Sequence, residues 1–195
     1  MEYLDWSESA AFRRRLAGKL KAGAIVMMPT DTVYGLVARA DDQSAVRRVF
    51  DIKRRNRGKA LLVLVSSMNM VEKYCRLNGR QRESLRGLWM GRRPITAILP
   101  HRNRLPRELT GEEDGLAVRL PKTDFLRKMI RAVGAPLIAT SANQSGQPVL
   151  DADSASLAFR RGPKPDLVVR GGNNRRSVSR LVLIKENGGV TVIRP

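Results

Sequence analysis

Residues 24–36 read Ala-Ile-Val-Met-Met-Pro-Thr-Asp-Thr-Val-Tyr-Gly-Leu. The apolar run at 24–28 predicts a short buried strand, which Pro29 ends. Hydroxyl groups, a carboxylate and a glycine follow directly. Because α/β folds bind ligands where strands end, residues 29–36 are a candidate binding segment. An ordinary strand-to-helix turn, capped by Asp31 or Thr32, is the alternative.

Hydrophobic periodicity predicts alternating helices and strands over the rest of the chain. We expect helices at residues 10–22, 41–55, 68–76, 80–88, 123–133 and 152–161. Further strands are expected at residues 60–65, 95–99, 116–120, 136–139, 166–169, 181–184 and 190–194. Ser7 or Ser9 is expected to cap the first helix and Gly23 to end it. The alternation indicates a single α/β domain over residues 1–195, with a mixed sheet and flanking helices.

The composition is strongly basic. The 195 residues include 37 Lys and Arg against 18 Asp and Glu, so the formal net charge is +19. Arginine predominates and its planar fork suits phosphate and carboxylate, which favours acidic partners. Aromatic residues make up only 5% and are not interleaved with the basic groups, so a stacking platform for single strands is not expected. Contact with structured RNA and plain solvated arginine faces both stay open.

Several classes of protein are excluded by what the sequence lacks. The longest apolar runs, 24–28 and 60–65, fall far short of the roughly 20 residues of a membrane span. Residues 1–6 do not resemble a secretory signal, so we expect a cytoplasmic protein. With one cysteine, Cys75, and one histidine, His101, neither an internal disulfide nor a cysteine-rich zinc site can form. The phosphate-loop and dinucleotide fingerprints are also missing.

Three further segments combine polar side chains with buried strands. Residues 53–59 contain five cations, which suits a polyphosphate, although a solvated helix end would look the same. In the strand at 116–120, alternation places Ala117 and Arg119 on the face opposite Leu116 and Val118. There Arg119 would hold a carboxylate bidentately or simply face solvent. Residues 136–148 run from an apolar strand into small hydroxyl and amide residues, which indicates another ligand-facing strand end.

Together these segments resemble the threonylcarbamoyl-AMP synthases, the TsaC/YrdC family. Pro-Thr-Asp-Thr-Val-Tyr-Gly-Leu at 29–36 and Thr-Ser-Ala-Asn-x-Ser-Gly-x-Pro at 140–148 are the specific blocks. Lys53-x-Arg55 followed by Lys59, and Ala-Val-Arg-x-Pro at 117–121, match in order and spacing. The resemblance covers nearly the whole chain and implies the short, single-domain form. It also implies a twisted mixed sheet with flanking helices and a positively charged concave surface.

The resemblance implies a nucleotidyltransferase that joins L-threonine, bicarbonate and ATP into threonylcarbamoyl-adenylate and pyrophosphate. That adenylate feeds the N6-threonylcarbamoyl modification of adenosine 37 in tRNA, through a separate threonylcarbamoyl transferase complex. Mg²⁺ is expected with ATP, without a protein-held metal site. The alternative is a non-catalytic YrdC-like paralogue that binds double-stranded RNA or tRNA through its basic surface in RNA or ribosome maturation.

The resemblance also implies roles for individual residues. The catalytic cations would be Lys53 and Arg55. The threonine subsite would contain Thr32, Arg119 and Ser179, where the family's serine matches either Ser177 or Ser179. The ATP subsite would contain Lys53, Arg55, Lys59, Ser141, Asn143 and Arg194. Residues 88–96 and 176–180 depart from the family's usual blocks, and Leu64 stands where some longer relatives carry a histidine.

Overall fold

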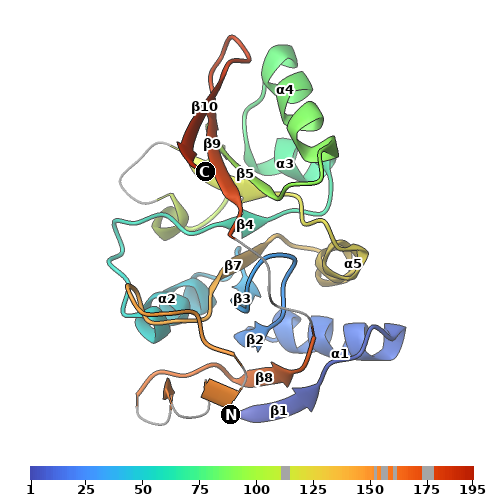
Figure 1. Ribbon diagram of the computed structural model, residues 1–195, viewed down its shortest axis with the longest axis vertical. Coiled ribbons are helices and arrows are strands. Elements are labelled where there is room, and N and C mark those ends of the chain that lie inside the picture. The colour runs from blue at the N-terminus through green and yellow to red at the C-terminus, as the bar shows by residue number, and fades with distance from the viewer. Residues whose placement is uncertain (111–114, 152, 155–157, 160–161, 173–177) are drawn as a thin grey trace.

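The computed structural model describes residues 1–110, 115–151, 153–154, 158–159, 162–172 and 178–195. One sheet runs through these residues (Figure 1). Its strands are β1 (Glu2–Asp5), β2 (Val26–Met28), β3 (Gly35–Arg39), β4 (Val63–Leu64), β5 (Ile95–Leu99), β6 (Leu116–Arg119), β7 (Leu137–Ser141), β8 (Leu167–Arg170), β9 (Arg180–Ile184) and β10 (Val190–Arg194). The helices are α1 (Ala10–Lys21), α2 (Gln43–Lys53), α3 (Met68–Tyr74), α4 (Gly79–Met90), α5 (Asp124–Val133) and the 3-10 helix η1 (Arg107–Leu109).

The sheet is mixed, as the alternation of elements predicts. Its strand order is β1-β8-β2-β3-β7-β4-β6-β5-β9-β10. The pairs β1–β8, β8–β2, β4–β6 and β5–β9 are parallel, and the other neighbours are antiparallel. In the β3–β7 pair, Gly35 lies opposite Ser141. The two ligand-facing blocks of the sequence, 29–36 and 140–148, are therefore neighbours at one place in the sheet.

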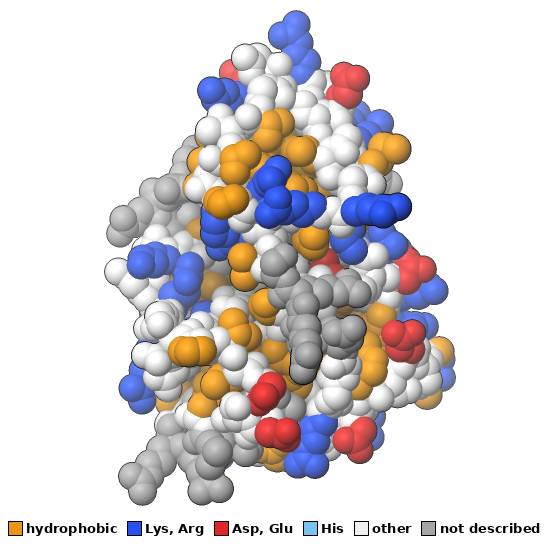
Figure 2. All heavy atoms as spheres, viewed as in Figure 1, with side chains coloured by type: hydrophobic (Ala, Val, Ile, Leu, Met, Phe, Trp, Pro, Cys, Tyr) orange, Lys and Arg blue, Asp and Glu red, His pale blue; other side chains and the backbone are white. Residues whose placement is uncertain are grey.

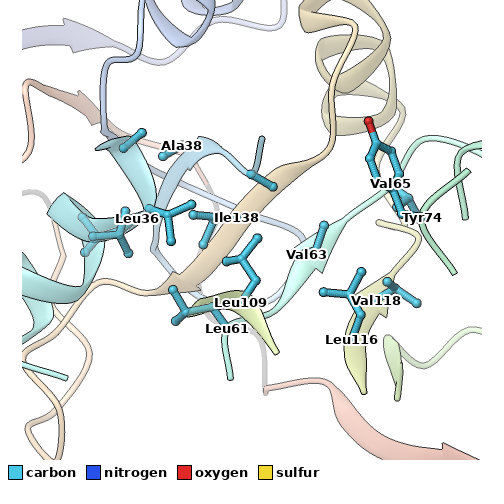
Figure 3. Close-up of a cluster of buried hydrophobic side chains, with 14 of the residues drawn as sticks. Leu36, Ala38, Leu61, Val63, Val65, Tyr74, Leu109, Leu116, Val118 and Ile138 are labelled. Atoms are coloured by element: carbon cyan, nitrogen blue, oxygen red, sulfur yellow. The ribbon is translucent and has the colours of Figure 1, made fainter. Parts of the chain in front are cut away.

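The central strands of the sheet are buried on both faces. Met27 and Val63 belong to a core cluster that includes Phe50 of α2. The next residues along these strands, Met28 and Leu64, belong to a second cluster with α1 and α5. Figure 3 shows the first cluster, in which side chains of β3, β4, β6 and β7 converge. Burial on both faces explains why these strands are continuously apolar rather than alternating.

Local sequence signals account for the helix ends. The side chain of Ser9 accepts a hydrogen bond from the backbone N–H of Phe12, which confirms it as the cap of α1. Gly23 follows α1 with φ of 81°, a conformation that favours glycine. The predicted helix at 152–161 lies largely outside the described residues. No helix in the described part of the chain is both long and apolar enough to span a membrane.

Three strands differ from the sequence-based expectation. The sequence pattern does not predict β1 or β3, and β4 is two residues long rather than six. Before β4, the N–H of Leu61 donates to Leu109 O at 3.3 Å rather than to a neighbouring strand. Leu62 O still accepts from the N–H of Ala139 in β7 at 3.0 Å. The regular pairing therefore fades gradually ahead of β4.

The surface carries dispersed cations and one gathering of apolar side chains. On the face in Figure 2, Lys and Arg side chains are scattered rather than collected in one patch. Exposed large apolar side chains are frequent on β9 and β10, where they include Leu183, Val190, Val192 and Ile193. β10 lies at the edge of the sheet. The face in Figure 2 therefore shows no single cationic patch that would mark an anion-binding site.

Candidate active site

A cavity of about 430 Å³ lies beside β5, β6 and β7 and is also lined by Ala60, Leu61 and Leu62 ahead of β4. Segments far apart in the sequence line it. Among its lining residues are seven of the nine candidates: Thr32, Arg55, Lys59, Arg119, Ser141, Ser179 and Arg194. The other two, Lys53 and Asn143, do not line the cavity. Cys75 and His101 do not line it either.

Strand alternation places Arg119 at the cavity. Ala117 and Arg119 line it, whereas Leu116 and Val118 lie in the hydrophobic core, as the alternation predicts. The side chain of Arg119 is only 2% exposed, so the interpretation as a solvent-facing arginine is wrong. Burial lowers the pKa of Arg119, and the charge of nearby Asp31 opposes that effect. A buried cation in a cavity wall is well suited to bind an anionic group.

Two consecutive residues hold the guanidinium of Arg119. Its Nη2 donates to Asp31 Oδ1 at 3.0 Å, and its Nη1 donates to Thr32 Oγ1 at 3.2 Å. The backbone around them is fixed by Thr30, whose Oγ1 donates to Val33 O at 2.6 Å and accepts from the N–H of Thr32 at 3.1 Å. This segment leads into β3, so the alternative of a strand-to-helix turn is wrong.

The basic segment after α2 folds back toward the cavity. Arg54 ends α2 with φ of 47°, which reverses the chain direction. Arg55 then donates from Nε to Lys59 O at 3.2 Å and from Nη2 to Ala60 O at 2.8 Å. Burial lowers the pKa of Arg55. The segment is therefore not merely a solvated helix end: it presents Arg55 and Lys59 to the cavity.

Lys53 lies behind the cavity wall. The residue is only 2% exposed. Its ammonium group donates to Ser141 O at 2.6 Å, Asn143 O at 2.9 Å and Asn143 Oδ1 at 2.8 Å. All three donors are thus used within the protein. Burial, with a smaller effect of the charge on Arg55, lowers the pKa of Lys53 to about 8. Its interactions tie the loop after β7 to the end of α2.

The C-terminal strands complete the cavity. Ser179 lines it, and its Oγ lies 2.7 Å from Thr96 Oγ1 in a buried hydroxyl pair. Arg194 donates from Nη2 to Ser179 O at 2.9 Å. Ser177, the other candidate for the family's serine, lies outside the described residues. Of these two candidates, Ser179 is the one that the structure describes, and it lines the cavity.

The chemical character of the lining favours an anion. Among the described lining residues, Arg55, Lys59, Arg119 and Arg194 are cationic and none is an aspartate or glutamate. Asp31 lies behind Arg119, outside the lining. Over the described part of the chain, no three His, Cys, Asp or Glu side chains are grouped so that they could hold a metal ion. Cations and hydroxyl groups suit carboxylate and phosphate groups.

Sequence reasoning missed some of the hydroxyl groups in the lining. Thr96 and Thr110 line the cavity outside every predicted binding segment, whereas Thr30, which also lines it, lies within residues 29–36. Thr96 lies on β5 between the core residues Ile95 and Ala97. Its contact with the cavity could have been predicted, because strand alternation places Thr96 on the face opposite these two core residues. Thr110 follows a 3-10 turn and has no such signal.

Residues 18–195 match the family model Sua5/YciO/YrdC, which carries the description "Telomere recombination". The chain belongs to this family. Curated relatives include a threonylcarbamoyl-AMP synthase of Pyrococcus abyssi, 33% identical over 183 residues. That match covers 93% of this chain and 53% of the relative, so the chain spans about half that relative's length. A threonylcarbamoyl-AMP synthase of Xanthomonas axonopodis pv. citri is 38% identical over 138 residues, covering 69% of this chain and 72% of the relative.

Solved structures of the Sua5/YciO/YrdC family share the fold. The Sua5 protein of P. abyssi in complex with L-threonine has a TM-score of 0.85 at 31% identity. The match covers 100% of this chain and 56% of that one. E. coli YciO has a TM-score of 0.81 at 18% identity, covering 99% of this chain and 92% of that one, and supports the fold alone. The expected α/β fold with a mixed sheet is confirmed.

Proposed function

We propose that this chain is a threonylcarbamoyl-AMP synthase, which forms L-threonylcarbamoyladenylate and pyrophosphate from L-threonine, bicarbonate and ATP. The observation that carries the proposal is the meeting of seven candidate residues from distant segments in one cationic cavity. The names of the curated relatives, and the threonine complex of P. abyssi Sua5, support it. They favour this enzyme over the alternative of a non-catalytic RNA-binding paralogue.

The proposed reaction requires two anions to approach each other. The amine of threonine adds to bicarbonate with loss of water and yields a carbamate. A carbamate oxygen then attacks the α-phosphorus of ATP, and the bond to the departing pyrophosphate breaks. Cations in the cavity offset the repulsion between carbamate and triphosphate and stabilise charge on the leaving group. No nucleophile of the protein is needed, because positioning lowers the barrier.

The threonine end of the cavity is assigned to Arg119, Thr32 and Ser179. Arg119 would bind the substrate carboxylate, since its guanidinium is the buried cation of the lining. Its Nε is buried and has no hydrogen-bond partner among the described residues, so this donor is unsatisfied without a ligand. The hydroxyl groups of Thr32 and Ser179 line the same cavity and would contact the polar atoms of threonine.

The ATP end is assigned to the basic segment and the loop after β7. Arg55, Lys59 and Arg194 would contact the phosphates, with Arg55 as the catalytic cation that stabilises the transition state. Ser141 would contact the nucleotide directly. Lys53 and Asn143 lie one hydrogen bond behind Ser141, so we assign their contribution to the shape of this subsite.

Mg²⁺ would enter as part of the substrate, bound through ATP phosphates and water. The described cavity residues offer it no carboxylate, so we assign no step to a protein-held metal. The adenylate would pass to a threonylcarbamoyl transferase complex that modifies tRNA. We place this reaction in the cytoplasm, where ATP, bicarbonate and tRNA occur together. Direct binding of tRNA or double-stranded RNA to the basic surface is a separate hypothesis.

Pyrophosphate release from ATP and Mg²⁺ tests the proposal. It should require both L-threonine and bicarbonate, and omission of either should abolish it. Arg119→Ala should lower kcat/KM for threonine about a hundredfold or more, since a charge-assisted bidentate contact is lost. Arg131→Ala, which removes an exposed arginine of α5, is the matched control and should leave kcat/KM unchanged. Pyrophosphate release that ignores threonine would contradict the proposal.

A further inference from the structure

Asp31 is a fully buried carboxylate at the edge of the cavity, with 0% of the residue exposed. A buried charge is costly unless hydrogen bonds and an opposite charge compensate it. Both oxygens of Asp31 are compensated: Oδ1 accepts from Arg119 Nη2 at 3.0 Å, and Oδ2 accepts from the N–H of Lys122 at 2.9 Å. Since neither oxygen lines the cavity, Asp31 does not offer itself as a ligand for substrate.

The contacts of Asp31 fix both the charge and the direction of Arg119. The ion pair joins two side chains that are each at most 2% exposed, so water does not screen it. Asp31 and Thr32 together hold the two terminal nitrogens of the guanidinium. A planar group held at both ends cannot rotate, and its Nε keeps one orientation. This is the kind of second contact that orients a binding group before the ligand arrives.

The second oxygen of Asp31 contacts the backbone shortly after β6. The N–H of Lys122 lies three residues after Arg119, and the ammonium group of Lys122 donates to Trp89 O at 2.6 Å and to Gly91 O. Asp31 therefore connects the turn after β2 to the end of β6, and Lys122 extends this connection to the end of α4. The contacts of Asp31 with Arg119 and with the Lys122 backbone hold the end of β6 against the segment that carries Thr32.

We propose that Asp31 is a positioning residue for substrate recognition: it stabilises the cationic form of Arg119 and fixes the orientation of the guanidinium in the cavity wall, ready for the carboxylate of the amino-acid substrate. The identity of that substrate rests on the proposed function. Asp31 acts entirely through Arg119 and takes no part in ATP binding. Its removal should therefore change amino-acid affinity and leave ATP affinity as it was.

A double-mutant cycle on Asp31 and Arg119 tests this inference. Asp31→Asn should weaken L-threonine binding, measured by calorimetry without ATP, about tenfold or more. It should raise the KM for threonine by a similar factor and change the KM for ATP less than twofold. In the Arg119→Gln background, Asp31→Asn should have no further effect on threonine binding. Asp124→Asn removes an exposed aspartate that pairs with Arg127 at 2.6 Å, and should behave as the parent protein.

Folding of the variants is followed by thermal unfolding. Asp31→Asn leaves the buried charge of Arg119 without its counter-ion, and Arg119→Gln leaves that of Asp31 without its own. Combining the two substitutions replaces the ion pair with two neutral side chains. The double variant should therefore unfold at a higher temperature than Asp31→Asn alone. If Asp31→Asn does not fold, Asp31→Glu takes its place: it keeps the charge but displaces the carboxylate by one methylene, so threonine binding should still weaken while the KM for ATP stays unchanged. A folded Asp31→Glu protein with parental threonine affinity would then overturn the inference. If Asp31→Asn weakens threonine binding as much in the Arg119→Gln background as in the parent protein, the inference is overturned.

The outcomes also separate this inference from the proposed function. A parent protein that binds threonine but forms no pyrophosphate would contradict the synthase proposal, while calorimetry would still measure the coupling of Asp31 to Arg119. A parent protein that does not bind threonine would overturn both. An active parent protein in which Asp31→Asn folds and keeps its threonine affinity would overturn the positioning role alone.

Discussion

Lys53, the last residue of α2, donates two hydrogen bonds to Asn143 after β7: 2.9 Å to its backbone oxygen and 2.8 Å to its side-chain Oδ1. The backbone N–H of Ser145 donates back to Lys53 O at 2.8 Å. Two segments far apart in the sequence are thus joined behind one wall of the cavity. Ser141, which lines it, also belongs to this network, because its Oγ donates to Asn143 Oδ1 at 2.6 Å.

Replacing Lys53 with Met should destabilise the protein and weaken ATP binding. Three buried or partly buried acceptors would lose their donor, which should lower the free energy of unfolding by about 3 kcal/mol. The KM for ATP should rise about tenfold, with a smaller effect on threonine. Urea unfolding and initial-rate kinetics measure these effects. Lys128→Met on the exposed face of α5 is the control, and a Lys53→Met protein with parental stability would contradict the network's role.

The depressed pKa of Lys53 predicts a pH dependence of stability. Burial lowers its pKa from 10.5 to about 8. Between these two values the unfolded chain binds a proton that the folded chain has lost, so the free energy of unfolding rises with pH there. The parent protein should therefore gain stability relative to Lys53→Met by up to about 3 kcal/mol between about pH 8 and pH 10.5. Urea unfolding measures the difference in unfolding free energy between the parent protein and Lys53→Met. A difference that stays constant or falls across this pH range would contradict the prediction.

Much of the fold can be predicted from the sequence where a single rule dominates. The strands Ile95–Leu99 and Val190–Arg194 have the expected bounds, because apolar runs ended by turn residues are unambiguous. β3 is missed because its glycine and the preceding polar residues indicate a turn. β1 is missed because its short, half-polar sequence has no period, and only its parallel pairing with β8 makes it a strand.

The candidate site is predicted in part for a similar reason. The motifs identify Thr32, Arg119 and Ser141, and strand alternation correctly directs Arg119 away from the core. The inward direction of Lys53 depends on the left-handed turn at Arg54 and on acceptors some 90 residues away. No local pattern contains that information. A row of cations therefore predicts an anion site without showing which cation touches the anion.

Gly35 should not tolerate a side chain. A Cβ at this position would lie 3.0 Å from Thr30 Cγ2 and 3.1 Å from the backbone oxygen of Thr140. Because the β7 backbone cannot move freely, Gly35→Ala should cost about 1–3 kcal/mol of unfolding free energy and lower the proposed synthase activity. Gly87→Ala is the matched control: nothing lies within 4 Å of its Cβ, and alanine should stabilise α4 by up to about 1 kcal/mol. Equal stability of the two variants would contradict the close approach.

Ser179→Ala should separate the two subsites. Loss of one hydroxyl contact should raise the KM for threonine about tenfold, which corresponds to about 1.4 kcal/mol. The KM for ATP should change little, although Thr96 loses its 2.7 Å partner. Thr96→Val removes the same hydroxyl pair but keeps Ser179. If Ser179 contacts threonine directly, Thr96→Val should raise the KM for threonine less than Ser179→Ala does. Initial rates over a range of threonine concentrations measure both variants, and equal effects would assign the pair a structural role.

Arg194 and Lys59 should govern ATP affinity through charge. Both line the cavity from distant parts of the chain, and each should contribute about 1.4 kcal/mol to binding of the triphosphate. Arg194→Gln and Lys59→Gln should therefore each raise the KM for ATP about tenfold, with little change for threonine. Because salt screens exposed charges, added salt should weaken ATP binding less in each variant than in the parent protein. Lys185→Gln, an exposed cation between β9 and β10 that does not line the cavity, is the control. A loss as large in Lys185→Gln would mean that ATP responds to the overall basic charge rather than to these two side chains.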